Sequence, residues 1–340
     1  MRALVCAAYG PIENLRVEDV PMPKPRAGEI LVRVGAAGVS FAAMLGVQGK
    51  HQNKPPMPYV PGNEMAGHIV ELGVGVTNVR VGQRIATGVS QGAYAEYAVA
   101  AAANAVVIPE TMPYAEATNF PTLYPTAYGA LKWKANLQPG EVLLVHGAGG
   151  GSGLTGIEVG KAMGATVIAS AGGTDKLKAA REAGADHLID YRKEDPRAKV
   201  LELTGGRGAD VVYDPVGGSA FDISLRCIAP EGRLIPMGFA SGTVPQIPAN
   251  ILLVKNVTVI GFYYGYYNGW GGKSEPTPKE AAALAARRAM VADAQAELMR
   301  WFTEGKLKAT VAATLDLADW VKAFKLIEER TVVGKAVLVP

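Results

Sequence analysis

The sequence predicts an α/β protein with two parts: a small, mostly β domain, and a doubly wound domain whose parallel sheet has about six strands. Three observations carry this expectation. The first third holds short, alternating or β-branched stretches between Gly and Pro residues. Beyond Tyr114, continuous apolar stretches alternate with helical patterns, which is typical of a parallel sheet covered on both faces. The 340 residues, 49% of them hydrophobic, are enough for two domains.

The first part consists of strands separated by turns. The opening apolar run breaks at Gly10 and Pro11, so it predicts a first strand rather than a signal peptide. Further strand-like stretches cover residues 29–39, 66–73, 82–88 and 93–100. The Ala/Val-rich stretch at 98–108 is too short to span a bilayer.

The second part alternates strands and helices. "VLLVHG" (142–147) predicts a buried strand, and a glycine turn and the helix "GIEVGKAMG" (156–164) follow it. "ATVIASAG" (165–172) predicts a second strand, which the helix "TDKLKAAREAG" (174–184) follows. Four more strands are predicted at 187–191, 209–217, 232–238 and 256–265. This alternation indicates a Rossmann-type sheet.

The C-terminal part has a sequence pattern that differs from the alternation before it. It predicts one or two helices within 279–305, a short helix over 320–329 and a closing strand at 334–340. We expect this part to return to the first domain. Residues 1–115 and 270–340 would then form one discontinuous domain, and residues 116–269 would form the other.

Charge and cysteine content exclude several classes of protein. The net charge of +3 is small for this length and comes without a concentrated basic patch, so nucleic-acid binding is not expected. Two cysteines, Cys6 and Cys227, are too few for a disulfide framework and suit small buried apolar residues. They favour a reducing, cytoplasmic setting.

Five of the seven residues from Gly147 to Gly153 are glycines. A buried strand, a glycine turn and a helix in succession form the phosphate-binding corner of a dinucleotide fold, where backbone N–H groups approach a pyrophosphate. The spacing GxGxxG fails because Ser152 stands at its sixth position, whereas GxxGxxG fits at Gly147, Gly150 and Gly153.

The end of the second strand bears on the choice of dinucleotide. An NAD site usually has an acidic residue there, and this chain has Ser170, which leaves room for a 2′-phosphate. Lys176 follows on the next helix, and Tyr191 ends the third strand. Each of these two also suits an ordinary role, as a solvated helix residue or a half-buried strand end. Asp175 suits the first turn of a helix better than a ribose ligand.

Segments along nearly the whole chain resemble the zinc-free quinone oxidoreductases of the medium-chain dehydrogenase/reductase superfamily. The resemblance lies in "GVS" (38–40), "YVPGNEMAG" (59–67), "PTAYGAL" (125–131), "LQPGEVLLVHGAGGGSG" (137–153), "AGADHLIDYRKED" (183–195), "VVYDPVGG" (211–218) and "GRLIPMGFASG" (232–242). It implies a GroES-like catalytic domain, a Rossmann domain, NADPH as cofactor and a homodimer.

The resemblance also implies roles for individual residues. The pyrophosphate turn would comprise Gly147, Gly150, Gly151, Ser152 and Gly153, with Gly in place of the family's first Ala. The 2′-phosphate pocket, next to Ser170, would comprise Gly173, Lys176, Tyr191 and Arg330. Positions around the nicotinamide would be Thr126, Gly238, Phe239 and Ser241.

The zinc dehydrogenases of the superfamily carry Cys and His at two positions where this chain has Ser40 and Asn63. The chain also lacks a cluster of four cysteines. Its histidines, at 51, 68, 146 and 187, have no metal-ligand spacing, and Glu64 alone is not a metal site. We therefore expect no metal.

The substrate side is less determined. Ser40 is a candidate polar donor and, with Asn63, a candidate substrate contact, although relatives that reduce quinones often have Asn in place of Ser40. The aromatic stretch "GFYYGYYNGWGG" (261–272), with Tyr263 and Tyr264, predicts either a wall that stacks on flat substrates or a core or interface segment.

The sequence and the resemblance together predict hydride transfer from NADPH to a quinone or related conjugated carbonyl. Ser40, a nicotinamide ribose hydroxyl or water would donate to the developing oxyanion. An enone, 2-alkenal or enoyl-thioester reductase is the alternative enzyme. A non-catalytic NADPH-binding protein, crystallin-like or RNA-binding, is the alternative from another class.

Overall fold

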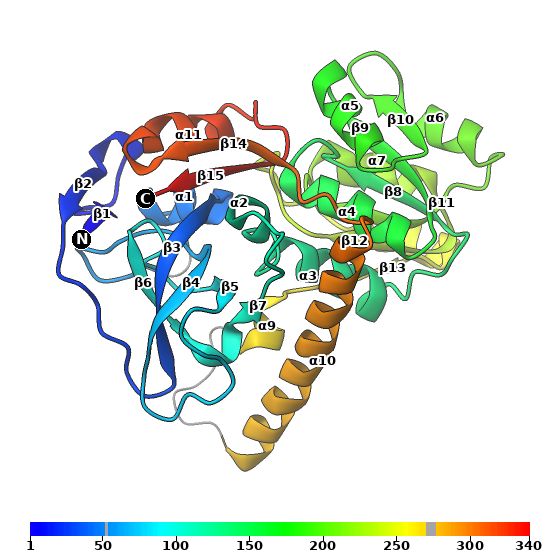
Figure 1. Ribbon diagram of the computed structural model, residues 1–340. Coiled ribbons are helices and arrows are strands. Elements are labelled where there is room, and N and C mark those ends of the chain that lie inside the picture. The colour runs from blue at the N-terminus through cyan, green and yellow to red at the C-terminus, as the bar shows by residue number, and fades with distance from the viewer. Residues whose placement is uncertain (52–53, 270–276) are drawn as a thin grey trace. The chain divides into compact units, whose positions relative to one another are not determined.

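The computed structural model describes residues 1–51, 54–269 and 277–340 (Figure 1). They form two compact units: Met1–Thr122 with Ala309–Pro340, and Leu123–Lys308. We call these unit 1 and unit 2. The chain passes between the units twice, after Thr122 and after Lys308, so unit 1 is discontinuous in sequence.

The limits of these units differ from the domain limits that we expected at 115 and 270. Helix α10 (Pro278–Thr303), which we placed with the first domain, belongs to unit 2. The physical reason is its packing, because α10 lies against α3 (Leu123–Tyr128) and α9 (Gly265–Asn268), both in unit 2.

Unit 1 is built on a sheet of seven strands in the order β14-β15-β3-β4-β5-β7, with β6 alongside β3. These are β3 (Glu29–Val39), β4 (Glu64–Leu72), β5 (Arg84–Gly88), β6 (Tyr97–Ala101), β7 (Val106–Val107), β14 (Val311–Asp316) and β15 (Lys335–Val339). β14 and β15 are parallel, and the other pairs are antiparallel. β3 is buried along most of its length because β4, β6 and β15 all pair with it.

Short elements surround this sheet. A separate antiparallel pair is formed by β1 (Arg2–Val5) and β2 (Arg16–Asp19). The helices of unit 1 are α1 (Phe41–Val47), α2 (Tyr114–Ala117), α11 (Trp320–Glu328) and the 3-10 turns Ile12–Asn14, Ala102–Asn104 and Leu317–Asp319. Tyr94 and Phe324 meet edge to face in the core, with ring centroids 6.0 Å apart. Segments from both ends of the chain therefore share one core.

Unit 2 is built on a parallel sheet of six strands in the order β10-β9-β8-β11-β12-β13. These are β8 (Val142–His146), β9 (Thr166–Ala171), β10 (His187–Asp190), β11 (Ala209–Asp214), β12 (Ile228–Pro236) and β13 (Thr258–Val259). The strand order reverses between β8 and β11. In such sheets, ligands bind outside the carboxyl ends of the strands at this reversal.

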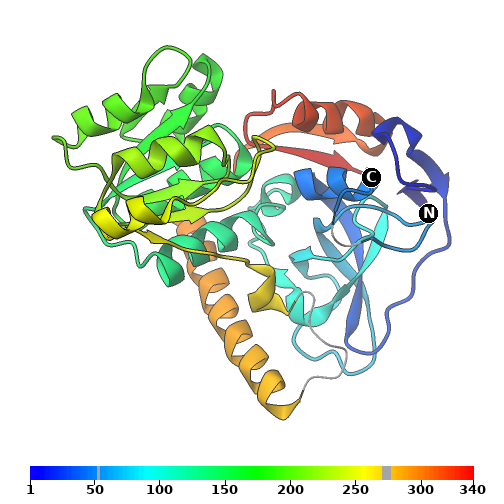
Figure 2. The same cartoon turned by 180° about the vertical axis from the view of Figure 1, so that it is seen from behind.

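Helices cover both faces of this sheet, as the front and back views show (Figure 1; Figure 2). Besides α3, α9 and α10, they are α4 (Gly151–Ala162), α5 (Thr174–Glu182), α6 (Pro196–Leu203), α7 (Ser219–Cys227), α8 (Ala249–Lys255) and a π-helical turn at Gly129–Lys134. α4 packs on α3 and α5, and α6 packs on α7. The predicted fold class, a mostly β domain plus a six-stranded Rossmann sheet, is confirmed.

Two details differ from the sequence-based expectation, and one alternative that it left open is decided. The strand expected at 256–265 contributes only Thr258–Val259 to the sheet. The helical region after residue 277 is a single helix, which begins with a capping box between Thr277 and Glu280. β14 was not expected, although its side chains alternate between half-buried and exposed.

Candidate functional site

The glycine turn joins β8 to α4 at the carboxyl edge of the six-stranded sheet. Gly147 has φ of +57°, a left-handed conformation that favours glycine. The turn is closed by a hydrogen bond from the Gly150 N–H to the Gly147 carbonyl (3.0 Å) and is tied to β9 by one from Ala148 to Ser170 (3.1 Å). Gly150 precedes the first turn of α4, and no described side chain caps that turn. Its N–H groups can therefore bind an anion.

The glycines of this turn serve different purposes. A Cβ on Gly153 would overlap the carbonyl oxygen of Gly147 and lie 2.7 Å from the Cα of Ala148. A Cβ on Gly149 would overlap the side-chain stem of Lys176. For Gly150 the nearest atom, the Gly147 oxygen, is 3.6 Å away, which is an ordinary contact. Gly153 is therefore required by the protein's own packing, whereas Gly150 leaves space open outside the turn.

A group of basic and polar side chains lies beside the turn, at the ends of β9 and β10. We call it the basic corner: it consists of the side chains of Lys176, Tyr191 and Arg192, together with the glycines next to them, Gly149, Gly172 and Gly173. A Cβ on Gly172 would lie 2.7 Å from both the Tyr191 hydroxyl and the Arg192 Nε. Gly173, at φ +96°, directly precedes α5, which carries Lys176. The sequence reasoning did not name Gly149, Gly172 or Arg192 as site residues, and Arg192 is the one of these with a functional side chain. Its only signal was its place directly after Tyr191 in a charged stretch.

Asp190 holds the loop of the basic corner in place. Its Oδ1 accepts hydrogen bonds from the backbone N–H groups of Arg192 (3.1 Å) and Gly173 (3.4 Å). Burial alone would raise the pKa of Asp190, but these bonds and the Lys193 ammonium outweigh it and lower that pKa. Ser170, at the end of β9, is 2% exposed, and its carbonyl supports the glycine turn.

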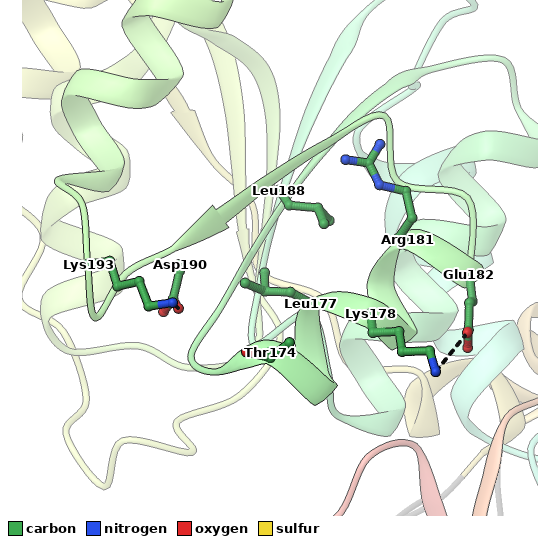
Figure 3. A pocket seen from close by; sticks show the side chains of 8 residues that line it. All are labelled: Thr174, Leu177, Lys178, Arg181, Glu182, Leu188, Asp190 and Lys193. Carbon is green, nitrogen blue, oxygen red and sulfur yellow. Dashed lines mark ion pairs between the residues drawn. The ribbon is translucent and has the colours of Figure 1, made fainter.

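A hollow of about 520 Å³ lies next to the basic corner, over α5 and β10 (Figure 3). Leu177 and Leu188 face it in the middle, and the Lys178–Glu182 ion pair lies on one side. Its other lining residues are Thr174, Arg181, Asp190 and Lys193. It contains none of the predicted site residues.

The loop after β11 and the loop after β12 contact each other at the carboxyl edge of the six-stranded sheet, where the glycine turn also lies. Asp214 accepts hydrogen bonds from Val216 (2.8 Å) and Gly217 (3.0 Å), which shapes the first loop. The N–H of Ser241 donates to the carbonyl of Val216 (2.9 Å). Gly238 and Phe239 lie in the second loop, and a Cβ on Gly217 would meet the Phe239 ring at 3.0 Å. Unit 2 thus brings the turn, the basic corner and the 238–241 loop to one edge.

Some polar residues at this edge face inward instead. The Ser152 hydroxyl lies 3.0 Å from that of Tyr213, and burial raises the pKa of Tyr213 to about 12. His146 is buried with its Nε2 2.9 Å from the Ser224 hydroxyl. Burial lowers the pKa of His146, against the opposing charge of Asp214. His146 and the Ser152 hydroxyl therefore support the fold, whereas contact of Ser152 with a pyrophosphate stays a prediction. Thr126 is half-buried on α3, which packs on α4.

Ser40 and Asn63 come together in unit 1. The Ser40 hydroxyl donates to the Asn63 Oδ1 (3.2 Å) and accepts from the N–H of Ala43 (3.1 Å), so it caps α1. The two side chains form a half-buried polar pair. The next residue, Glu64, is 4% exposed and pairs with Lys335. Among the described residues, no three His, Cys, Asp or Glu side chains come together as a metal site.

Arg330 lies in unit 1, two residues after the end of α11, with φ of +55°, and it is exposed. The basic corner belongs to unit 2. A contact between Arg330 and the same phosphate therefore stays a prediction.

The aromatic stretch after β13 packs within unit 2. The ring centroids of Tyr267 and Trp133 are 4.9 Å apart. The ring centroid of Tyr128 lies 5.8 Å from that of Trp133 and 5.7 Å from that of Trp301. Tyr264 is 4% exposed, whereas Tyr263 is 53% exposed. Part of the stretch, around Tyr264, is therefore core, and Tyr263 remains available at the surface. Residues 270–272 lie outside the described ranges.

No helix in the described part of the chain combines the length and apolar character needed to cross a membrane.

Comparison with known proteins places the chain in a family. Residues 26–110 match the model described as "Alcohol dehydrogenase GroES-like domain", and residues 151–285 match "Zinc-binding dehydrogenase". A quinone oxidoreductase-like protein 2 homolog of Nematostella vectensis is 37% identical over 99% of this chain and 88% of its own length.

Two solved structures cover 100% of this chain. The Escherichia coli quinone oxidoreductase complexed with NADPH has a TM-score of 0.87 at 28% identity over 100% of its own chain. A 2-haloacrylate reductase has a TM-score of 0.82 at 28% identity over 99% of its own chain. The chain therefore belongs to the quinone oxidoreductase family of the medium-chain dehydrogenase/reductase superfamily.

Proposed function

We propose that this protein is a cytoplasmic, NADPH-dependent oxidoreductase that reduces quinones or related conjugated carbonyls without a metal ion. The basic corner carries the proposal. It puts Lys176, Tyr191 and Arg192 beside a glycine turn, at the end of a strand where Ser170 replaces an acidic residue. The free, buried state of Cys6 and Cys227 suits a reducing compartment.

The residues of unit 2 fit NADPH. The open N–H groups at the start of α4 suit the pyrophosphate, and the space outside Gly150 lets it come close. Lys176, Tyr191 and Arg192 would hold the 2′-phosphate by charge and hydrogen bonds. Gly238, Phe239 and Ser241, with Thr126, would border the nicotinamide half. When bound, NADPH supplies the hydride.

The acceptor side rests on Ser40 and Asn63. In their hydrogen-bonded pair the Ser40 proton is engaged by the Asn63 oxygen, so the Asn63 NH2 group is the donor that can orient an acceptor oxygen and stabilise charge that develops on it; Ser40 would donate only after giving up that bond. The names of the two structural neighbours cover quinone reduction and reduction of a conjugated acid. An enone, 2-alkenal or enoyl thioester shares the conjugated carbonyl, so a panel of these acceptors and quinones identifies the substrate. Turnover of none of them would favour a non-catalytic NADPH-binding protein.

Cofactor kinetics test the proposal. We expect kcat/KM to favour NADPH over NADH by about a hundredfold, because hydrogen bonds to a charged phosphate are worth about 1.5–3 kcal/mol each. Lys176→Ala and Arg192→Ala should each raise the KM for NADPH about tenfold and leave that for NADH nearly unchanged. Lys178→Ala, on the same helix and paired with Glu182, is the matched control. Equal losses with both cofactors would show that the 2′-phosphate lies elsewhere.

Independence of metal has its own test. Ser40 and Asn63 stand at two positions where zinc ligands would be needed, and neither Ser nor Asn is a usual zinc ligand. We expect purified protein to hold no stoichiometric zinc by elemental analysis and to keep its rate in chelator. One tightly bound zinc per chain would contradict this.

A homodimer would fit the edge of the unit 2 sheet. β13 is the last strand in the sheet order and pairs with β12 on one side. An edge strand can pair with a second copy of the chain. Sedimentation at micromolar concentration should show a dimer, and a monomer would refute this part of the proposal.

A further inference from the structure

The chain passes between the units at two places, and the side chain of Glu158 accepts a hydrogen bond from a residue next to each of them. We call them the crossings: the first follows Thr122 and the second follows Lys308. Glu158 lies on α4 and is 1% exposed. Its Oε2 accepts a hydrogen bond from the Tyr124 hydroxyl (2.5 Å) and another from the backbone N–H of Lys308 (3.0 Å). A single carboxylate oxygen thus reaches the start of unit 2 and its last residue.

The second crossing has a constrained backbone. Ala309 has φ of +49°, which is unfavourable for a residue with a Cβ and persists only where neighbours fix it. Lys308 is fixed on one side of this residue by Glu158 and by its ammonium, which donates to the carbonyl of Glu182 at the end of α5. The carbonyl of Ala309 accepts from the side chain of Asn119 (3.4 Å). The path of the chain here therefore depends on side-chain hydrogen bonds.

Glu158 lies on the helix that starts at the glycine turn. It stands seven positions after Gly151, which is about 10 Å along a helix. It is therefore too far along α4 to touch a phosphate bound at the turn. A helix is stiff over this distance, so a ligand that orders the start of α4 also steadies Glu158. Changes in the orientation of two units are absorbed where the chain passes between them.

We propose that Glu158 is a positioning residue that couples occupation of the glycine turn to both crossings, and so steadies the geometry needed for hydride transfer. The identity of the ligand as NADPH rests on the proposed function. The coupling itself rests on the two hydrogen bonds of Oε2 and on the position of Glu158 in α4.

Hydrogen–deuterium exchange, read by mass spectrometry, tests the coupling without turnover. Peptides covering residues 119–126 and 305–312 report on the crossings, with and without saturating NADPH. Glu158→Gln keeps an oxygen acceptor, whereas Glu158→Leu removes it. Tyr124→Phe removes one donor and leaves the bond to Lys308. Ser224→Ala is the control, because it also deletes buried hydrogen bonds of unit 2, to His146 and to the carbonyl of Ala220, and involves none of Tyr124, Glu158 and Lys308.

We expect NADPH to slow exchange severalfold at both crossings in the wild type, in Glu158→Gln and in Ser224→Ala. In Glu158→Leu the slowing should vanish. In Tyr124→Phe it should vanish at 119–126 and persist at 305–312. Equal slowing in the wild type and in Glu158→Leu would overturn the proposal. If Glu158→Leu fails to fold, Tyr124→Phe decides, and unchanged slowing at 119–126 would overturn the proposal.

Kinetics give a second measurement. Glu158→Leu should lower kcat about tenfold, as misplacement of reacting groups does, while the Kd for NADPH stays within about twofold. Glu158→Gln should restore most of the rate. Equal losses in Glu158→Leu and Ser224→Ala would indicate a merely structural role and overturn the proposal.

The two proposals fail in different ways. Titration of the wild type that shows no NADPH binding overturns the proposed function. Exchange in the free proteins then still decides whether Glu158 holds the crossings, because the Lys308 amide should exchange about tenfold faster in Glu158→Leu, as expected when a buried hydrogen bond is lost.

Discussion

Lys335 and Glu64 form a buried ion pair inside unit 1, with Nζ and Oε1 2.8 Å apart and both side chains almost fully out of solvent. The Lys335 ammonium also donates to the carbonyl of Thr118 (2.6 Å). Burial lowers the pKa of Lys335, and the Glu64 carboxylate opposes this shift. A Cβ on Gly38 would overlap the Lys335 side chain, so glycine is needed there. The pair joins β15, from the end of the chain, to β4, directly beside Asn63.

Removing one partner of this pair should be strongly destabilising. Lys335→Met would leave the Glu64 carboxylate buried and unpaired, which costs about 3–5 kcal/mol of unfolding free energy. The double variant Lys335→Met/Glu64→Gln should recover much of this loss, because no charge is then buried. Urea unfolding measures the unfolding free energy of the single and of the double variant. A single variant with the wild-type midpoint would contradict the pairing.

Two glycines of the phosphate turn should respond differently to substitution. Gly153→Ala should lower the unfolding free energy by about 1–3 kcal/mol, because the new Cβ overlaps the backbone of Gly147. Gly150→Val should keep a folded protein and abolish NADPH binding, because its side chain enters the space outside the turn. Thermal unfolding and cofactor titration separate the two effects. Normal NADPH binding by Gly150→Val would mean that the pyrophosphate lies elsewhere.

Asp186 should contribute stability that is lost in acid. Its carboxylate pairs with Lys161 (2.8 Å) and accepts from the N–H of Val167 (2.7 Å). Burial alone would raise the pKa of Asp186, but these partners outweigh it and lower that pKa below its ordinary 3.8. The stabilisation is therefore complete above about pH 4 and is lost as the pH falls through the lowered pKa.

Asp186→Asn measures this contribution. At pH 7 it should lower the unfolding free energy by about 1 kcal/mol, a small value because solvent screens a pair that is one-third exposed. The difference from the wild type should shrink as the pH falls from 4 to 2. Urea unfolding at several pH values checks this, and a difference that grows in acid would contradict it.

The neighbouring tyrosines of the aromatic stretch should have opposite phenotypes. Tyr264→Ala removes a side chain that is 4% exposed and should lower the unfolding free energy by about 3–5 kcal/mol. Tyr263→Ala removes an exposed ring and should change stability by less than about 1 kcal/mol. If Tyr263 stacks on a flat acceptor, one of the two roles that the sequence predicts for this stretch, its loss raises the acceptor KM severalfold, since such a contact is worth about 1 kcal/mol. An unchanged acceptor KM would restrict the stretch to packing.

The sequence was most informative where local patterns determine structure. Periodicity and glycine placement predicted the six-stranded sheet and the turn at Gly147, because strand burial and positive φ leave signals in neighbouring residues. The sequence did not identify Arg192, because a charged residue in a polar loop has the same pattern as any solvated residue. Only the structure shows that its side chain lies next to Gly172. Glu158 escaped notice because its partners, Tyr124 and Lys308, are distant in sequence.

Tertiary packing also decided two assignments that patterns alone left open. Tyr263 and Tyr264 are adjacent and chemically identical, and packing buries one of them while exposing the other. Helix α10 is rich in alanine and exposed along much of its length, so its own sequence does not show which unit it joins.

The discontinuous composition of unit 1 has a consequence for biosynthesis. The end of β3, at Ala37, Gly38 and Val39, pairs with β15, which the ribosome makes only after all of unit 2. Until β15 is made, the end of β3 in the nascent N-terminal segment therefore stays unpaired. The strands of the unit 2 sheet, in contrast, all lie within one continuous segment. An unpaired strand edge is a template for association with other chains. Translation that stalls near Lys308 would thus release a chain in which unit 2 is complete and unit 1 lacks β14 and β15. The unpaired edge of β3 would make this chain prone to aggregation.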